Sequence, residues 1–161
     1  MYLLGTDEYI KHVAEQYSQL LLRIAFLRLK STADAEDVVQ EVFLRLITKR
    51  PRFRSDDHEK AWLIRTAINL SCDMLKSSAR KNVPLDEELT SPQDEYHQLL
   101  SAVQSLPEKY ITVVHLYYYE EYSIKEIARI LGLPAATVGT RLSRARVLLK
   151  PILEREELLY E

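Results

Sequence analysis

A length of 161 residues suits one domain or two small ones, and a hydrophobic share of 47% excludes a chain that is disordered throughout. The net charge of −2 is unevenly spread: residues 82–101 hold five acids and no Lys or Arg, while cations gather at 141–150, so the total does not exclude nucleic acid. No stretch approaches the roughly 20 apolar residues of a membrane span, no signal peptide is evident, and the single cysteine, Cys72, permits no internal disulfide, so we expect a cytoplasmic protein without membrane insertion.

Apolar spacing in the first half predicts three helices, and with only three glycines the whole chain is expected to be all-α. The first helix is expected over 9–29. The second is expected over 34–48, with an inner face of Ala35, Val39, Val42 and Leu46. After a basic and then acidic loop at 49–59, the third is expected over 60–78, and its apolar residues occupy two sides, which predicts a well-buried helix.

Residues 81–95 interrupt this pattern with two prolines, polar residues and acids. They predict a flexible acidic linker between an N-terminal domain at 1–80 and a C-terminal domain at 96–161. The C-terminal domain is expected to open with a short helix that Pro107 ends and a second helix through about Tyr119. It is expected to close with a tail at 151–160.

Residues 123–150 have the pattern of a DNA-binding helix-turn-helix. Ser123 and Glu126 match a capping box, Gly132 is placed to end the first helix, and Pro134 suits the first turn of the second. The second helix is expected to bury Val138, Leu142, Ala145 and Leu149. It also carries four cations and no acid, namely Arg141, Arg144, Arg146 and Lys150. The alternative is an ordinary helical hairpin with a solvated basic face.

Three segments in this order resemble the extracytoplasmic-function group of bacterial sigma factors, the small promoter-recognition subunits of RNA polymerase in the sigma-70 family. They are DAEDVVQEVFLRL at 34–46, AWLIRTAINLSCDML at 61–75, and 106–146, which contains EIARILGLPAATVGTRLSRAR. The resemblance implies a protein that binds core RNA polymerase and promoter DNA, directs transcription initiation and is controlled by an anti-sigma factor. It implies no catalytic residue, cofactor, metal or small-molecule substrate.

The resemblance also assigns residues to three contacts. Core polymerase is expected to meet an acidic helical face, namely Asp34, Asp37, Val38, Gln40, Glu41 and Leu44. The minus-ten element, held as single strand, is expected to meet Arg50, Arg52, Arg54, Lys60, Arg65, Asn69 and Lys76. The minus-thirty-five duplex is expected to meet Thr137, Thr140, Arg141, Ser143, Arg144 and Arg146.

Several positions leave alternatives open. The acidic face can be a solvated surface, Trp62 can be a core residue rather than a base-stacking one, and Arg146 can brace its own domain. Two departures from the family pattern stand out, because Gly139 occupies a position where members commonly place a cation and Glu121 replaces a frequent glycine.

Other function classes fit less well. The four histidines are widely spaced and no glycine-rich phosphate loop is present, which disfavours an enzyme. The main alternative is a stand-alone helix-turn-helix repressor or activator with an N-terminal dimerisation or sensing domain, although such a protein has no need of the acidic 34–46 segment. A purely protein-binding helical adaptor leaves the basic recognition helix unexplained.

Overall fold

The computed structural model describes residues 7–81 and 95–159, with side chains at 7–77 and 99–154, and every element in those stretches is a helix. The chain divides into two compact units, residues 1–87 and 88–161, each of which is considered by itself. The predicted linker at 81–95 lies almost wholly outside the described residues.

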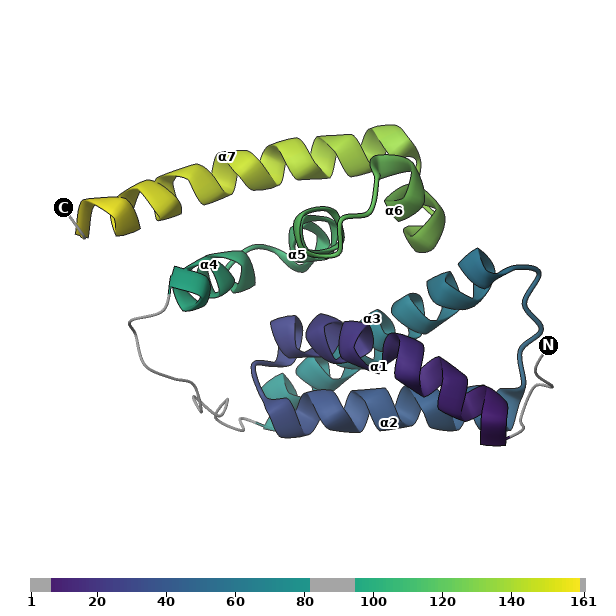
Figure 1. Ribbon diagram of the computed structural model, residues 1–161. Helices are drawn as coiled ribbons and strands as arrows, with labels where there is room; N and C mark the ends of the chain where they lie inside the picture. The colour runs from purple at the N-terminus through teal and green to yellow at the C-terminus, as the bar shows by residue number, and fades with distance from the viewer. Residues whose placement is uncertain (1–6, 82–94, 160–161) are drawn as a thin grey trace. The chain divides into compact units, whose positions relative to one another are not determined.

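The first unit contains three helices: α1 (Asp7–Leu29), α2 (Thr32–Lys49) and α3 (Asp56–Lys81). α1 and α2 run antiparallel, and α3 packs against both (Figure 1). The Ser31 hydroxyl accepts a hydrogen bond of 3.2 Å from the Asp34 amide, which caps α2 two residues before the predicted start. All three helices contribute fully buried apolar side chains to the core, among them Val13, Leu21, Ile24, Val42, Leu46, Leu63 and Ile64.

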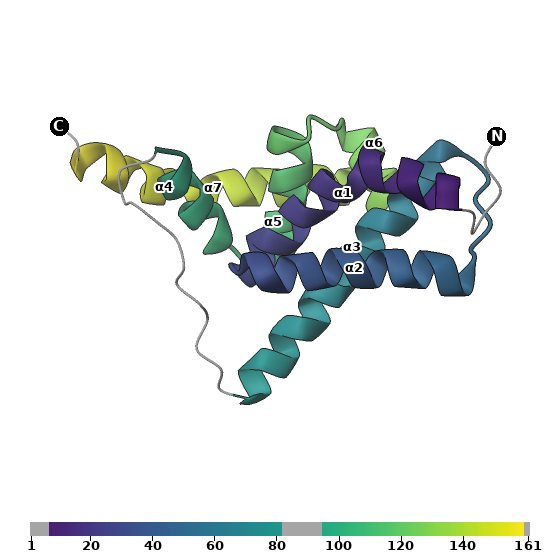
Figure 2. The ribbon, with the colours of Figure 1, turned by 60° about the horizontal axis from the view of Figure 1, so that its bottom comes forward.

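The third helix departs from its prediction at both ends. It begins at Asp56 rather than Lys60, because the Ser55 hydroxyl caps it by accepting a 3.1 Å hydrogen bond from the His58 amide. The buried residues of α3 are Leu63, Ile64, Ala67 and Ser71, which lie within one arc of about 100° rather than on two sides of the helix. Its C-terminal half extends past the α1 and α2 pair (Figure 2), so no described helix of this unit covers it and its apolar side chains are only half-buried.

The second unit contains α4 (Glu95–Gln104), α5 (Glu108–Val114), a π-helical turn η1 (His115–Tyr119), α6 (Ile124–Leu131) and α7 (Ala135–Leu159). α4, α5 and α6 all pack against α7, the long helix drawn in yellow in Figure 1. The predicted inner face of α7 is confirmed, since all of its members are buried: Val138, Leu142, Ala145 and Leu149.

A π-helical turn replaces the end of the helix that was predicted to run to Tyr119. The Glu120 amide donates to the His115 carbonyl at 3.1 Å, a bond that spans five residues instead of four. The side chains of the same two residues are also in contact, with His115 Nε2 and Glu120 Oε2 2.9 Å apart. The chain then turns at Glu121, whose φ of 60° is left-handed, so the turn closes without the glycine that favours this geometry.

The predicted tail at 151–160 is wrong, because α7 continues through Pro151 to Leu159. Proline in a helix interior removes one backbone hydrogen bond and costs about 3 kcal/mol. Packing offsets this cost, since α7 is in contact with α4 and Leu153 lines the same groove as Leu99.

The caps of the helix-turn-helix are as predicted. The Glu126 amide donates to the Ser123 hydroxyl, and the Ser123 amide donates to the Glu126 carboxylate, both at 3.1 Å. Gly132 ends α6 with a left-handed φ of 66°. Pro134 lies just before α7 rather than in its first turn, and its carbonyl accepts a 3.0 Å hydrogen bond from the Thr137 amide.

Candidate nucleic-acid interface

The outward face of α2 combines acids with exposed apolar side chains. Asp37, Gln40, Glu41, Leu44 and Ile47 lie within one arc of about 120° at 100° per residue, so they form one ridge, here called the α2 face. Leu44 is 53% exposed and Ile47 is 40% exposed. Burying such side chains releases about 25 cal/mol for each Å² of apolar area, so this face is suited to a protein partner.

One predicted polymerase contact lies in the core. Val38 is 1% exposed and belongs to the core, so it is not a surface residue. The residues that α2 buries are Ala35, Val38, Val42 and Leu46, so Val38 takes the place of Val39 in the predicted stripe. Asp34 is half-buried in the first turn of α2, three residues before Asp37, and its amide donates to the Ser31 hydroxyl.

The loop between α2 and α3 presents three exposed cations, Arg50, Arg52 and Arg54. Phe53 anchors the loop, since its ring lies edge-on to Trp62 with centroids 5.8 Å apart and touches His58 in the same manner at 5.4 Å. The Trp62 ring is therefore used, in part, to hold the loop. This anchoring keeps the arginines in solvent, where they are able to neutralise phosphates.

The outward side of α3 brings together three of the predicted minus-ten contacts. Arg65, Asn69 and Lys76 are exposed and lie on one helical stripe, although Asp73 interrupts it. Lys60 lies about 140° around the helix from Arg65, at 100° per residue, so it does not join this stripe. The stripe offers cations for phosphates and one amide for a base edge.

In the second unit, α5 and α7 enclose a basic hollow of about 330 Å³. Four of the predicted minus-thirty-five residues line it, namely Thr137, Thr140, Arg141 and Arg144, whereas Ser143 and Arg146 do not. Lys109 and Tyr110 of α5 complete the lining. Lys109 is an isolated cation in the sequence, and only the packing of α5 against α7 brings it to the recognition helix.

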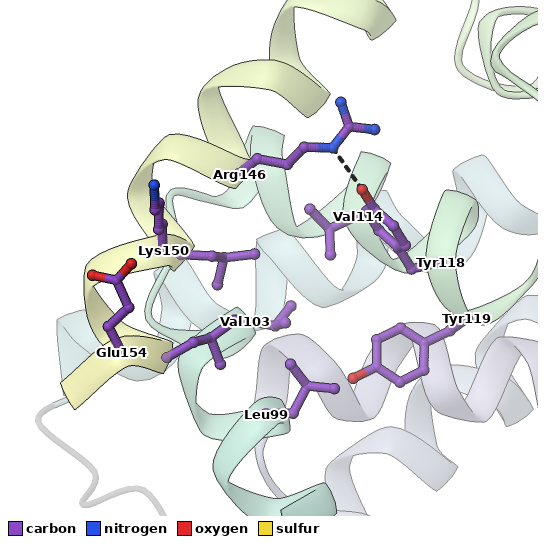
Figure 3. A pocket seen from close by; sticks show the side chains of 10 residues that line it. Leu99, Val103, Val114, Tyr118, Tyr119, Arg146, Lys150 and Glu154 are labelled. Carbon is purple, nitrogen blue, oxygen red and sulfur yellow. Dashed lines mark hydrogen bonds between the residues drawn. The ribbon is translucent and has the colours of Figure 1, made fainter. Parts of the chain in front are cut away.

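Arg146 makes contacts within its own unit. Its Nε donates a 2.6 Å hydrogen bond to the Tyr118 hydroxyl (Figure 3), and its guanidinium lies 5.7 Å and 6.0 Å from the ring centroids of Tyr118 and Tyr117. The hydrogen bond to Tyr118 raises the pKa of Arg146, so the group stays charged. This geometry favours the bracing alternative over a direct DNA contact.

A second, apolar groove of about 660 Å³ lies between α4, α5, η1 and the C-terminal half of α7. Its apolar lining includes Leu99, Val103, Val114, Leu149 and Leu153, and Arg146, Lys150 and Glu154 also border it (Figure 3). Val147 and Leu148, on the same stretch of α7, are exposed as well. This part of the unit therefore presents apolar surface that a protein partner could cover.

Two searches of the described residues gave negative results. No group of three His, Cys, Asp or Glu side chains among them is arranged to hold a metal ion. None of their helices has the length and hydropathy needed to cross a membrane.

Comparison with known proteins gives matches over both units. The model of sigma-70 region 2 matches residues 13–81, and that of sigma-70 region 4 matches residues 96–149. RNA polymerase sigma factor SigV of Bacillus subtilis is 32% identical, with 88% of this chain and 89% of that protein covered. ECF RNA polymerase sigma factor SigW of the same organism is 27% identical, with 91% and 89% covered. The sigma factor RpoE of Bartonella quintana, solved with the anti-sigma factor NepR, superposes with a TM-score of 0.76 at 21% identity, covering 91% of this chain and 98% of that one.

These matches decide between the functional alternatives. A stand-alone repressor or activator has no reason to carry sigma region 2, which here covers the whole described part of the first unit from Val13 onward. Sigma factors select promoters for the polymerase and are not themselves enzymes. With regions 2 and 4 both present in order, the chain belongs to the extracytoplasmic-function group of the sigma-70 family and directs transcription initiation.

Proposed function

We propose that the two units divide the work of initiation between them. The first unit binds core RNA polymerase through the α2 face and holds the single-stranded minus-ten element on the arginine loop and the α3 stripe. The second unit binds the minus-thirty-five element as duplex through α7. Residues 81–95 link the two domains.

The α2 face is the observation that carries the polymerase contact. Leu44 and Ile47 are two large exposed apolar side chains one helical turn apart, and they lie beside Asp37, Gln40 and Glu41. The acids select a basic partner surface and the apolar side chains supply burial. Such a mixed face is typical of the docking surface of one protein on another.

The test is co-purification with core polymerase. The double variant Asp37→Lys/Glu41→Lys should lose binding to core while keeping its helical circular dichroism. Glu8→Lys/Glu15→Lys is a matched control, because both acids are exposed on α1 and the charge change is the same. Loss of binding in both double variants, or in neither, would contradict the assignment to the α2 face.

DNA binding is tested by transcription and footprinting. Core polymerase with this chain should protect both promoter elements and render thymines near the start site reactive to permanganate. The chain alone should bind promoter duplex weakly, since each unit offers only a small surface. A tight and specific footprint without core would contradict the proposed dependence on polymerase.

We also propose regulation by an anti-sigma factor and action in the cytoplasm, where the polymerase works. RpoE of Bartonella quintana was solved with such a partner, although its 21% identity compares the fold alone. In this chain the α2 face and the apolar groove of the second unit are two exposed apolar surfaces that a masking partner would cover. Competition between core polymerase and a co-purifying protein for the α2 face would test this.

A further inference from the structure

His58 ties the loop between α2 and α3 to the first turn of α3. Its Nδ1 accepts a 3.1 Å hydrogen bond from the Arg54 amide, and its own amide donates to the Ser55 hydroxyl at 3.1 Å. One bond joins the loop backbone to a helix side chain, and the other joins the helix backbone to a loop side chain. The loop is therefore closed onto the helix at the backbone of Arg54, one of the three arginines that it presents.

Aromatic contacts hold the ring of His58 in place. His58 and Trp62 are four residues apart on α3, which puts them on one face of the helix. Phe53 meets both rings edge-on, with its centroid 5.4 Å from that of His58 and 5.8 Å from that of Trp62. Phe53 is half-buried, whereas Arg52 and Arg54 on either side of it are exposed. These contacts restrict the orientation of the imidazole, which favours its hydrogen bond to the Arg54 amide.

The bond to Arg54 requires a neutral imidazole. A neutral imidazole has one nitrogen that accepts, and because the Arg54 amide is a donor, that nitrogen must be Nδ1. The imidazolium has two donors and no acceptor, so no rotation of the ring restores the bond after protonation. Histidine is the side chain that changes charge between about pH 5 and about pH 8. Acidification in that range should therefore free the backbone at Arg54.

Charged groups of both signs adjoin this ring. From α1, Tyr9 donates a hydrogen bond to the carboxylate of Glu59, the residue next to His58. The other charged groups of the adjoining segments are Lys49 and Arg50 at the end of α2, Arg52 and Arg54 in the loop, and Asp56, Asp57 and Lys60 in the first turns of α3. Protonation of His58 would add a positive charge among them, and that charge by itself attracts phosphate. A test must therefore distinguish the hydrogen bond from the charge.

We propose that His58 is a positioning residue whose neutral imidazole holds the arginine loop, residues 50–55, in the conformation that receives the single strand. This inference rests on the proposed minus-ten function of the first unit. The hydrogen bond at Arg54 orders the loop before DNA arrives, so less conformational freedom is lost on binding. Protonation of His58 releases that backbone and with it the arrangement of Arg52 and Arg54.

The first measurement is solvent exchange of the Arg54 amide, by NMR on the isotope-labelled full chain, relative to the intrinsic exchange rate at each pH. In the wild type, protection should fall about two- to tenfold between about pH 8 and about pH 5, because one hydrogen bond is lost. His58→Asn should keep the protection at both pH values, because asparagine Oδ1 is attached to Cγ, as histidine Nδ1 is, and does not titrate. His12→Ala, at an exposed histidine of α1, is the matched control and should behave as the wild type.

The second measurement is binding of the full chain to a fluorescent single strand of mixed sequence at about pH 8, where the charge of an imidazolium does not contribute. His58→Ala should weaken binding about two- to tenfold, whereas His58→Asn and His12→Ala should retain it. Equal losses in His58→Ala and His58→Asn, no loss in His58→Ala, or pH-dependent protection of Arg54 in His58→Asn would overturn the proposal. Failure of the proposed function would appear separately, as no promoter-directed transcription by the wild-type chain with core polymerase, since the exchange measurement needs no DNA.

Discussion

Gly139 lies in the interior of α7, at a position where the family pattern leads us to expect a cation, and replacing it should strengthen the helix. A Cβ atom at this position would meet no heavy atom within 4 Å, so a side chain fits without displacing a neighbour. Glycine in a helix interior costs about 1 kcal/mol relative to alanine. Gly139→Ala should therefore raise the free energy of unfolding by about that amount. For a unit of this size, the midpoint of thermal unfolding should rise by about 4–8 °C.

Gly139→Arg should add a DNA contact to this gain in stability. Position 139 lies two residues before Arg141, on the N-terminal part of the helix that is proposed to enter the major groove. One new phosphate contact should steepen the salt dependence of duplex binding by about 0.9. A new guanine contact should instead change selectivity at one base pair, by about 1–3 kcal/mol.

The assay compares wild type, Gly139→Ala and Gly139→Arg on a promoter library at several salt concentrations, alongside thermal unfolding. Gly139→Ala changes only the stability of the helix. The difference in DNA affinity between Gly139→Arg and Gly139→Ala therefore gives the effect of the added charge. Weaker binding of both variants to all sequences would refute the reasoning. It would mean that glycine is needed so that the backbone can approach DNA closely.

Three further outcomes follow from the contacts. Glu121→Gly should raise the free energy of unfolding in urea by about 1 kcal/mol, because it relieves a left-handed residue that carries a Cβ; a lower value would contradict this. Burial, and then a hydrogen bond to a carboxylate of α3, raise the pKa of Tyr9 above its ordinary 10.0. The contribution of the protonated Tyr9 hydroxyl to the free energy of unfolding is therefore fully present below pH 10 and is lost as the pH rises above it. Urea unfolding of Tyr9→Phe should be less sensitive to pH in that alkaline range. Arg146→Gln should leave the salt slope of duplex binding unchanged, because Tyr118 holds its guanidinium, whereas Arg144→Gln should lower it by about 0.9.

Local signals in the sequence predicted the helices and several of their ends. Ser123, Glu126 and Gly132 act through neighbours three or four residues away, so their pattern alone specifies the start and stop of α6. The inner face of α7 was also predictable, since a buried helix repeats its apolar residues at fixed intervals. The family resemblance added the order of the domains and the identity of the function.

Predictions failed where packing between helices decides the outcome. An apolar stripe at three- and four-residue spacing fits either Val38 or Val39 on the inner face of α2, and contacts with α1 and α3 bury Val38. The second half of α3 also carries apolar residues, yet it extends past α1 and α2 (Figure 2), so they are only half-buried. α7 likewise stays helical beyond Pro151, against the local preference of proline, and there Leu153 lines a groove with Leu99 and Val103 of α4.

The charges of the second unit show the same division between local pattern and packing. In the sequence, the four cations at 141–150 look equivalent, because they share a helix and no acid lies among them. Packing separates them: Arg141 and Arg144 line the basic hollow, while Arg146 is held by a tyrosine hydroxyl and Lys150 borders the apolar groove. The hollow also gains Lys109, which stands 27 residues before Ala136 in the sequence. A count of basic residues therefore identifies a nucleic-acid-binding helix, but the phosphate contacts depend on which cations the neighbouring helices leave available.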